Sequence, residues 1–91
     1  MSVLVKNLSG TTGKTLPKGY TSWLDFWEKK KGKNSFYCRK ILCNQIAEVG
    51  GHVIIKNTTN KEYIVPICKS CNNTYDHEFY VAESDLVEIH E

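Results

Sequence analysis

The stretch that decides the fold is YIVPICKSCNN, from Tyr63 to Asn73, in which an apolar run leads directly into two cysteines and two asparagines. Residues 63–67 have the aromatic and β-branched composition that is typical of a buried strand. Cys68 and Cys71 have the C-x2-C spacing with which the first turn of a helix can present two thiolates to one metal ion. The stretch therefore predicts a strand that ends at a metal site, where a helix begins.

A second pair, Cys38 and Cys43, lies upstream with C-x4-C spacing, and 24 residues separate the inner members of the two pairs. Two such pairs suit tetrahedral zinc, because each pair can span one edge of a tetrahedron with Zn–S bonds of about 2.3 Å. Four thiolates leave no open position for water or substrate, so the ion would be structural. We expect one structural Zn²⁺ bound by Cys38, Cys43, Cys68 and Cys71; two disulfides or an iron–sulfur cluster are the alternatives.

The size of the chain makes a metal important. With 91 residues, one domain buries only about 60 to 65% of the surface that its unfolded form exposes, and folds of this size usually need a metal or a disulfide. The apolar stretch in MSVLVKNLSG is too short for a signal peptide, and no run approaches the roughly 18 apolar residues of a membrane span. We therefore expect a cytoplasmic protein, in which paired cysteines more often bind metal than form disulfides.

Strands are expected between the two cysteine pairs. In IAEVGGHVIIK, residues 46–56, apolar and small side chains alternate with Glu48 and His52, which predicts a strand with one small apolar face. NTTN, residues 57–60, predicts a turn, and residues 62–67 predict the return strand. Pro66 has no N–H group, so it should place the return strand at a sheet edge or end its ladder. A hairpin between two cysteine pairs, of which the second opens a helix, is the treble-clef arrangement.

The first third of the chain contains the clearest helix signal. In TSWLDFWEKKKGK, residues 21–33, Ser22 and Asp25 form a near capping box and Gly32 supplies a stop, which predicts an amphipathic helix over 22–31. Its Trp23, Phe26 and Trp27 share one face, which favours core packing. We expect residues 1–35 to form an N-terminal arm with a short strand at 3–5, and residues 36–91 to form the four-cysteine domain. SGTTGKT, residues 9–15, lacks the spacing of a phosphate-binding loop, and tail strands are expected at 79–82 and 86–89.

Charge is distributed unevenly along the chain. Residues 1–40 carry nine Lys or Arg against two acids, whereas residues 41–91 carry three against eight, so the two parts have charges of about +7 and −5. A basic surface of this kind can bind DNA or RNA without reading sequence, and Tyr37 offers a ring for base stacking. The alternatives are a solvated, lysine-rich helix end and a surface that binds a protein partner. The candidate nucleic-acid contacts are Lys29, Lys30, Lys31, Lys33, Arg39 and Lys40.

The segments GGHVI and YIVPICKSCN, within residues 50–72, resemble the HNH (ββα-metal) nuclease family. The pattern VGGHV…YIVPICKSCN is similar, more closely, to a group of small microbial and phage-type proteins built on the same zinc module. The resemblance covers about residues 38–77 and implies a small α+β treble-clef domain with a zinc knuckle, a β-hairpin and a short helix, to which the N-terminal amphipathic helix is added.

The resemblance also bears on catalysis. In HNH enzymes a strand histidine is the general base and a second metal ion neutralises the phosphate; His52 matches that base, and Asn72, with Asp76 one turn later, matches the position that binds the catalytic ion. Gly51 stands where the family has an aspartate, and Tyr63 where an orienting asparagine is expected. These departures favour a non-catalytic, zinc-stabilised module that binds nucleic acid. An HNH-type endonuclease with His52 as base and a protein-binding adaptor are the alternatives.

Overall fold

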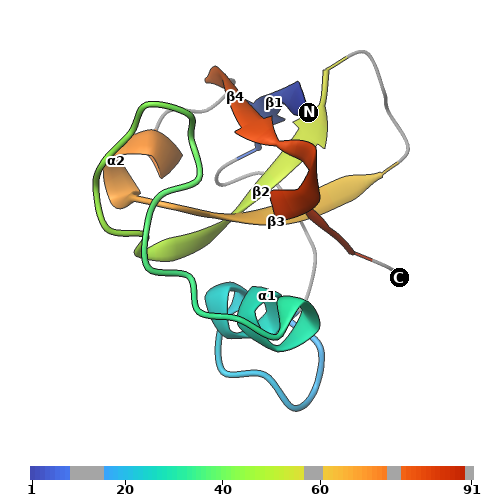
Figure 1. The fold of residues 1–91 in the computed structure, drawn as a ribbon. Helices are drawn as coiled ribbons and strands as arrows, with labels where there is room; N and C mark the ends of the chain where they lie inside the picture. The colour runs from blue at the N-terminus through green and yellow to red at the C-terminus, as the bar shows by residue number, and fades with distance from the viewer. Residues whose placement is uncertain (9–15, 57–60, 74–76, 90–91) are drawn as a thin grey trace.

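The computed structural model describes residues 1–8, 16–56, 61–73 and 77–89. The expected loop at 9–15, the expected turn at 57–60 and Asp76 lie outside these ranges. The elements along the chain are β1 (Ser2–Asn7), α1 (Trp23–Lys31), β2 (Val49–Ile55), β3 (Glu62–Ile67), α2 (Lys69–Asn72), β4 (Glu78–Ala82), the 3₁₀ helix η1 (Glu83–Asp85) and β5 (Val87–Ile89) (Figure 1).

The strands form one antiparallel sheet in the order β4-β1-β2-β3-β5. β2 and β3 are the expected hairpin, with Val53 opposite Tyr63. β1 comes from the segment expected to form an arm, but it lies inside the sheet, where Val5 pairs with Ile55 of β2 and with Phe79 of β4. Residues 1–35 and 36–91 therefore contribute to the same sheet, and the expectation of a small α+β fold is confirmed.

Pro66 has a different place in the sheet from the edge position considered above. β3 lies between β2 and β5, so it is an internal strand and the edge assignment is wrong. The ladder with β5 ends at Ile64, however, and the Pro66 carbonyl accepts a hydrogen bond of 2.8 Å from the Arg39 N–H instead. The N–H and C=O of one strand residue point to the same side of the strand. The side on which Pro66 lacks an N–H group is therefore the side on which β3 no longer pairs with β5.

The boundaries of α1 follow from its capping residues. Ser22 is the N-cap, and its Oγ accepts a hydrogen bond of 2.9 Å from the Asp25 N–H. The Asp25 carboxylate in turn accepts from the Thr21 N–H at 3.1 Å, a contact that lowers the pKa of Asp25. Gly32 ends the helix in the left-handed conformation, with φ 70°, and donates to the Glu28 carbonyl. The helix thus begins and ends as its sequence pattern predicts.

Two hydrophobic clusters lie on the two faces of the sheet. α1 covers one face, where Phe26 and the fully buried Trp27 pack with Ile64 and Ile89. The cysteines and α2 lie on the other face, and Figure 1 shows α1 and α2 separated by the sheet. The second cluster contains Val5, Val53, Val65, Ile67, Phe79, Val81 and Leu86 together with three of the cysteines. The Trp face of α1 is therefore core, as its spacing predicts.

Candidate metal centre

The first cysteine pair lies in a loop, residues 37–46, that we call the first cysteine loop. A β-bridge between Tyr37 and Ile46 closes its base, and the Cys38 N–H donates to the Gln45 carbonyl at 2.9 Å. The Cys43 N–H donates to the Lys40 carbonyl at 3.0 Å, so the chain reverses direction between the two cysteines. These backbone bonds bring both thiols to the same side of the loop.

The second pair is held where β3 ends. Cys68 follows Ile67 as the N-cap of α2, and Cys71 lies within that helix. The Cys68 side chain makes no capping hydrogen bond; the carboxylate of Glu48, just before β2, accepts from the Lys69 N–H at 3.0 Å instead. Glu48 thereby satisfies one donor at the start of the helix, which leaves the Cys68 sulfur available for a metal.

The end of α2 is fixed by β1. Asn7 is fully buried, and its Nδ2 donates to the Asn72 carbonyl at 3.0 Å. The Asn7 N–H donates to the carbonyl of His77, which lies just beyond α2 and before β4. Nothing in the local sequence signals this contact, because the two asparagines are 65 positions apart. The position of the second cysteine pair therefore depends on the first strand of the chain.

The four sulfur atoms converge. The Sγ–Sγ distance is 3.8 Å between Cys38 and Cys71. It is 3.9 Å for the pairs Cys43–Cys68 and Cys43–Cys71. All four atoms lie within 4.8 Å of one another. A tetrahedron with Zn–S bonds of about 2.3 Å has edges of about 3.8 Å, whereas a disulfide has an S–S distance of about 2.0 Å. The cysteines are free thiols arranged as a metal-binding group, so their predicted convergence is confirmed.

The surroundings of the thiols explain why a cation would stabilise them. Burial raises the pKa of Cys71, and it raises the pKa of Cys38 although backbone N–H groups of Cys68 and Lys40 favour the Cys38 thiolate. The backbone N–H of Gln45 lowers the pKa of Cys43, which is the more exposed member of the group. A divalent cation favours the thiolate at every ligand and offsets the desolvation of the buried ones. Soft sulfur ligands in this number select zinc or an iron–sulfur centre over magnesium or calcium.

The lysines of α1 and the turn after it lie at the surface. Lys29, Lys30 and Lys33 are exposed, and their ammonium groups lie 5.6 to 6.0 Å from the ring centroids of Tyr20, Phe26 and Trp27, respectively. Lys29 also forms an ion pair of 3.4 Å with Asp25. Their aliphatic stems can cover the aromatic face of the helix while the charges stay in water. Lys31 is partly buried.

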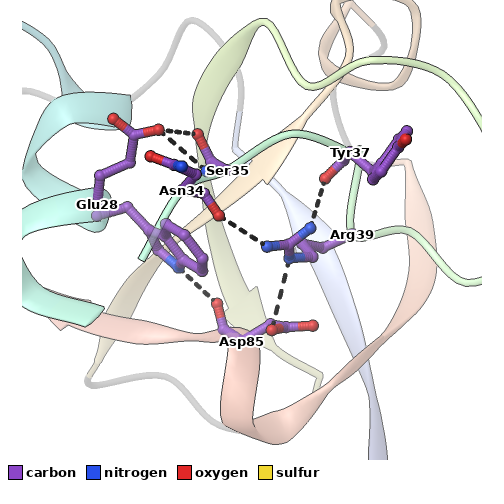
Figure 2. A network of polar contacts seen from close by, with 7 residues as sticks. Glu28, Asn34, Ser35, Tyr37, Arg39 and Asp85 are labelled. Carbon is purple, nitrogen blue, oxygen red and sulfur yellow. Dashed lines mark hydrogen bonds and ion pairs between the residues drawn. The ribbon is translucent and has the colours of Figure 1, made fainter. Parts of the chain in front are cut away.

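Arg39 points inward, unlike the exposed lysines. Its guanidinium lies 5.2 Å from the centroid of the Trp27 ring, and its Nε is 3.5 Å from the Asp85 carboxylate. Figure 2 shows the guanidinium also donating to the carbonyls of Tyr37 and Asn34, at 3.0 and 3.4 Å. Its side chain is only 19% exposed. Arg39 thus joins the first cysteine loop to α1 and η1, and only part of the guanidinium faces solvent.

His52 and Asn72 are placed on opposite faces of the sheet. The His52 ring lies 4.8 Å from the Trp23 ring of α1, at 83°, and its Nε2 is buried. Asn72 belongs to α2, and its Oδ1 faces Gly51 on the cysteine side of β2. The structure therefore does not bring together the two residues that match the HNH base and metal ligand. The His77 side chain has other contacts: its Nε2 is 3.5 Å from the Lys40 ammonium, and its ring packs on Phe79.

A scan against protein-family models finds no matching family, and searches of curated proteins and of solved structures find no match either. Neither helix in the described part of the chain has the length and apolar character that a membrane-spanning helix requires.

Proposed function

We propose that this protein is a binding module whose fold is stabilised by one structural zinc ion held by Cys38, Cys43, Cys68 and Cys71. The observation that carries the proposal is the spacing of the sulfur atoms, 3.8 to 3.9 Å for three of the pairs, which fits tetrahedral Zn–S geometry. With four thiolate ligands, the ion would have no open position and would serve stability alone.

The same residues support a treble-clef arrangement. The first cysteine loop comes first, the β2–β3 hairpin follows, and α2 begins at the second cysteine pair. This is the order that the resemblance to HNH-like modules implies. In an HNH-like module, β1 and α1 would be additions: β1 extends the sheet, and α1 covers its second face.

Metal analysis of the purified chain tests the zinc proposal. We expect one zinc per chain by mass spectrometry of the metal, no iron, and no thiol that reacts with a disulfide reagent until the protein is denatured. A Cys71→Ser variant should lose zinc, because a hydroxyl is a poor zinc ligand compared with a thiolate. Free, reactive thiols in a metal-free and folded protein would contradict the proposal.

We further propose that the module contacts nucleic acid through its basic surface. The six cations within residues 29–47 are accompanied by no acid, and three of the lysines are exposed. Contacts with phosphates release counterions, so the affinity should fall steeply with salt. Binding of labelled oligonucleotides measured between about 50 and 200 mM salt tests this. Lys29→Gln and Lys33→Gln should each weaken binding and reduce the salt dependence. Lys61→Gln should not, because Lys61 lies outside this run of cations and its ammonium pairs with Glu88 at 3.8 Å.

The placement of His52 supports a module without catalysis. Its ring makes an edge contact with Trp23, and Asn72 lies on the opposite face of the sheet, so the two residues that match the HNH base and metal ligand do not share a site. We expect no nicking of plasmid DNA with Mg²⁺ or Mn²⁺. Cleavage by the native chain that disappears in His52→Ala, with zinc content unchanged, would establish the nuclease alternative.

A further inference from the structure

A ring at the base of the first cysteine loop is held outside the protein core. Tyr37 is 60% exposed, and its bridge partner Ile46 is 68% exposed. Partners in such a bridge have Cβ atoms about 4.5 to 5.5 Å apart on one side of the ribbon. Tyr37 and Ile46 therefore form a small apolar surface that the described residues leave open to solvent.

The backbone beneath this surface is rigidly held. The Tyr37 carbonyl accepts from Arg39 at 3.0 Å, and the next residue, Cys38, belongs to the metal-binding group. Figure 2 shows the Tyr37 ring directed away from Asp85, toward which the Arg39 guanidinium points. A ring presented by a fixed backbone loses little entropy when a planar ligand stacks on it.

The charges around the ring favour a polyanion. Three acids of the neighbouring segments are engaged within the protein. The Glu28 carboxylate accepts from the N–H and Oγ of Ser35, at 3.0 and 2.7 Å, and Asp85 pairs with Arg39 (Figure 2). Glu48, which is exposed and lies two residues beyond Ile46, accepts from the Lys69 N–H at 3.0 Å. Lys33 and Lys40 flank the ring in the chain, and Lys33 is exposed. Phosphates next to a stacked base would thus meet cations, while each of these carboxylates already accepts a hydrogen bond or forms an ion pair.

Resting on the proposed nucleic-acid function, we infer that this surface binds single-stranded polynucleotide, with one base stacked on Tyr37 and the adjacent phosphates near Lys33 and Lys40. Bases inside a duplex are stacked on both faces and cannot reach a protein ring, whereas those of a single strand can. The lysines then supply affinity for any nucleic acid, and Tyr37 supplies the preference for unpaired strands.

The test compares zinc-loaded variants by fluorescence anisotropy on DNA and RNA strands of about 12 nucleotides and on the matching duplex, at about 50 mM salt. Tyr37→Ala should lower single-strand affinity by about 5- to 140-fold and leave duplex affinity within about twofold. Tyr37→Phe should restore binding, because the ring remains. Phe36→Ala is the matched control: Phe36 is 66% exposed, but as the neighbouring residue of an extended segment it points to the other side.

The possible failures can be told apart. If single strands bind with strong salt dependence but Tyr37→Ala changes nothing, or weakens duplex binding equally, the stacking inference is wrong and the proposed function stands. If the native chain binds neither form at about 50 mM salt, both are wrong, and the exposed Ile41 and Leu42 become the surface for a protein partner. Zinc content and circular dichroism of each variant show that the fold is unchanged.

Discussion

Leu42 is the residue at which the first cysteine loop departs from ordinary backbone geometry. Its φ is 74°, and it is the one non-glycine residue with positive φ in the part of the chain that the structure describes. The left-handed conformation costs a residue with a Cβ about 1 to 2 kcal/mol. Leu42 is also 94% exposed, so packing does not offset this cost. Leu42 is the last of the four residues between Cys38 and Cys43, where the backbone must change direction so that the Cys43 thiol can join the other three.

Replacing Leu42 by glycine should therefore stabilise the protein. Glycine removes the strain but adds flexibility to the unfolded chain, so we expect a net gain of about 0.5 to 1 kcal/mol in the free energy of unfolding. Urea denaturation of the zinc-loaded protein measures this. Ile41→Gly, at a neighbouring position with negative φ, should be destabilising. A loss of stability in Leu42→Gly as large as that in Ile41→Gly would show that the loop does not carry this strain.

At the scale of elements, α1 and β2 approach each other closely at Gly50. A Cβ at this position would lie 2.7 Å from the Trp23 carbonyl carbon and 2.8 Å from the Leu24 nitrogen, both of which are backbone atoms of α1. Gly51, the next residue, faces the other side of the sheet, and the first atoms its Cβ would meet belong to the side chain of Ile67. A helix backbone cannot move aside as a side-chain methyl group can, so the two glycines differ in what a substitution requires.

Gly50→Ala should consequently be more destabilising than Gly51→Ala. Forcing extra atoms into a packed contact costs about 1 to 3 kcal/mol, and we place Gly50→Ala at the upper end because the whole helix must shift. Thermal unfolding followed by Trp fluorescence measures both variants, since Trp23 and Trp27 lie on α1. Equal stability of Gly50→Ala and the native chain would mean that α1 does not rest on β2 at this point.

Arg39 connects three elements through side-chain contacts. It links the first cysteine loop to Trp27 of α1 and to Asp85 of η1, with both partners of the ion pair less than one fifth exposed. Partial burial reduces screening by water, and the pair is further supported by the hydrogen bonds of the guanidinium to two carbonyls. Through Arg39, the loop that contains Cys38 and Cys43 is connected to α1 on the opposite face of the sheet.

A double-mutant cycle between Arg39→Ala and Asp85→Ala should give a coupling free energy of about 1 kcal/mol. The matched control is the pair Lys61 and Glu88, whose atoms are 3.8 Å apart and whose side chains are 60% and 30% exposed. That pair should give less than about 0.3 kcal/mol, because water screens it. Coupling at Arg39 no greater than at Lys61 would contradict a linking role.

For the molecule as a whole, a small core on each face of the sheet leaves little stability to spare. Structural zinc contributes on the order of 10 kcal/mol in small zinc-binding peptides, and native domains are stable by only about 5 to 15 kcal/mol in total. Three of the four cysteines belong to the larger hydrophobic cluster, so four thiols without an ion would also leave poorly packed sulfur in that core. The proposed ion and the hydrophobic cluster would thus stabilise the same half of the fold.

Removal of zinc should therefore abolish cooperative unfolding. After treatment with a strong chelator, we expect loss of the thermal transition seen by circular dichroism, and recovery when zinc is added in excess under reducing conditions. Magnesium at the same concentration is the control and should restore nothing, because it prefers oxygen ligands. An unchanged melting curve in protein shown to be metal-free would reject a structural role for the ion.

Local features of this fold could be predicted from the sequence, and long-range ones could not. The ends of α1 depend on Ser22, Asp25 and Gly32, which act within a few residues, and the cysteine spacing predicted the group of thiols. By contrast, the place of β1 depends on Val5 meeting Ile55 and Phe79, and a short apolar stretch does not reveal its partners. The inward orientation of Arg39 likewise depends on Asp85, 46 positions away.

His52 shows a second reason for the difference. The sequence predicts that the face of β2 that carries His52 is polar, because His52 alternates with the apolar Val53. The side chains of His52 and Val53 do lie on opposite faces of the sheet. Period-two patterning identifies faces but does not say what covers each one. Here α1 covers the side of His52 through Trp23, which lies 29 positions upstream of the histidine.

The position of β1 between β2 and β4 also sets an order of assembly during synthesis. All four thiols have been made once Cys71 is added, but β4 and β5 need the 18 residues from Asn72 to Ile89, which take about 1 to 4 s at the usual rates of translation. The edge of β1 that pairs with β4 therefore stays without its partner strand until after the last cysteine has been made. Without the ion, α2 would not be anchored beside β1, and Asn7 would lose the Asn72 carbonyl to which it donates.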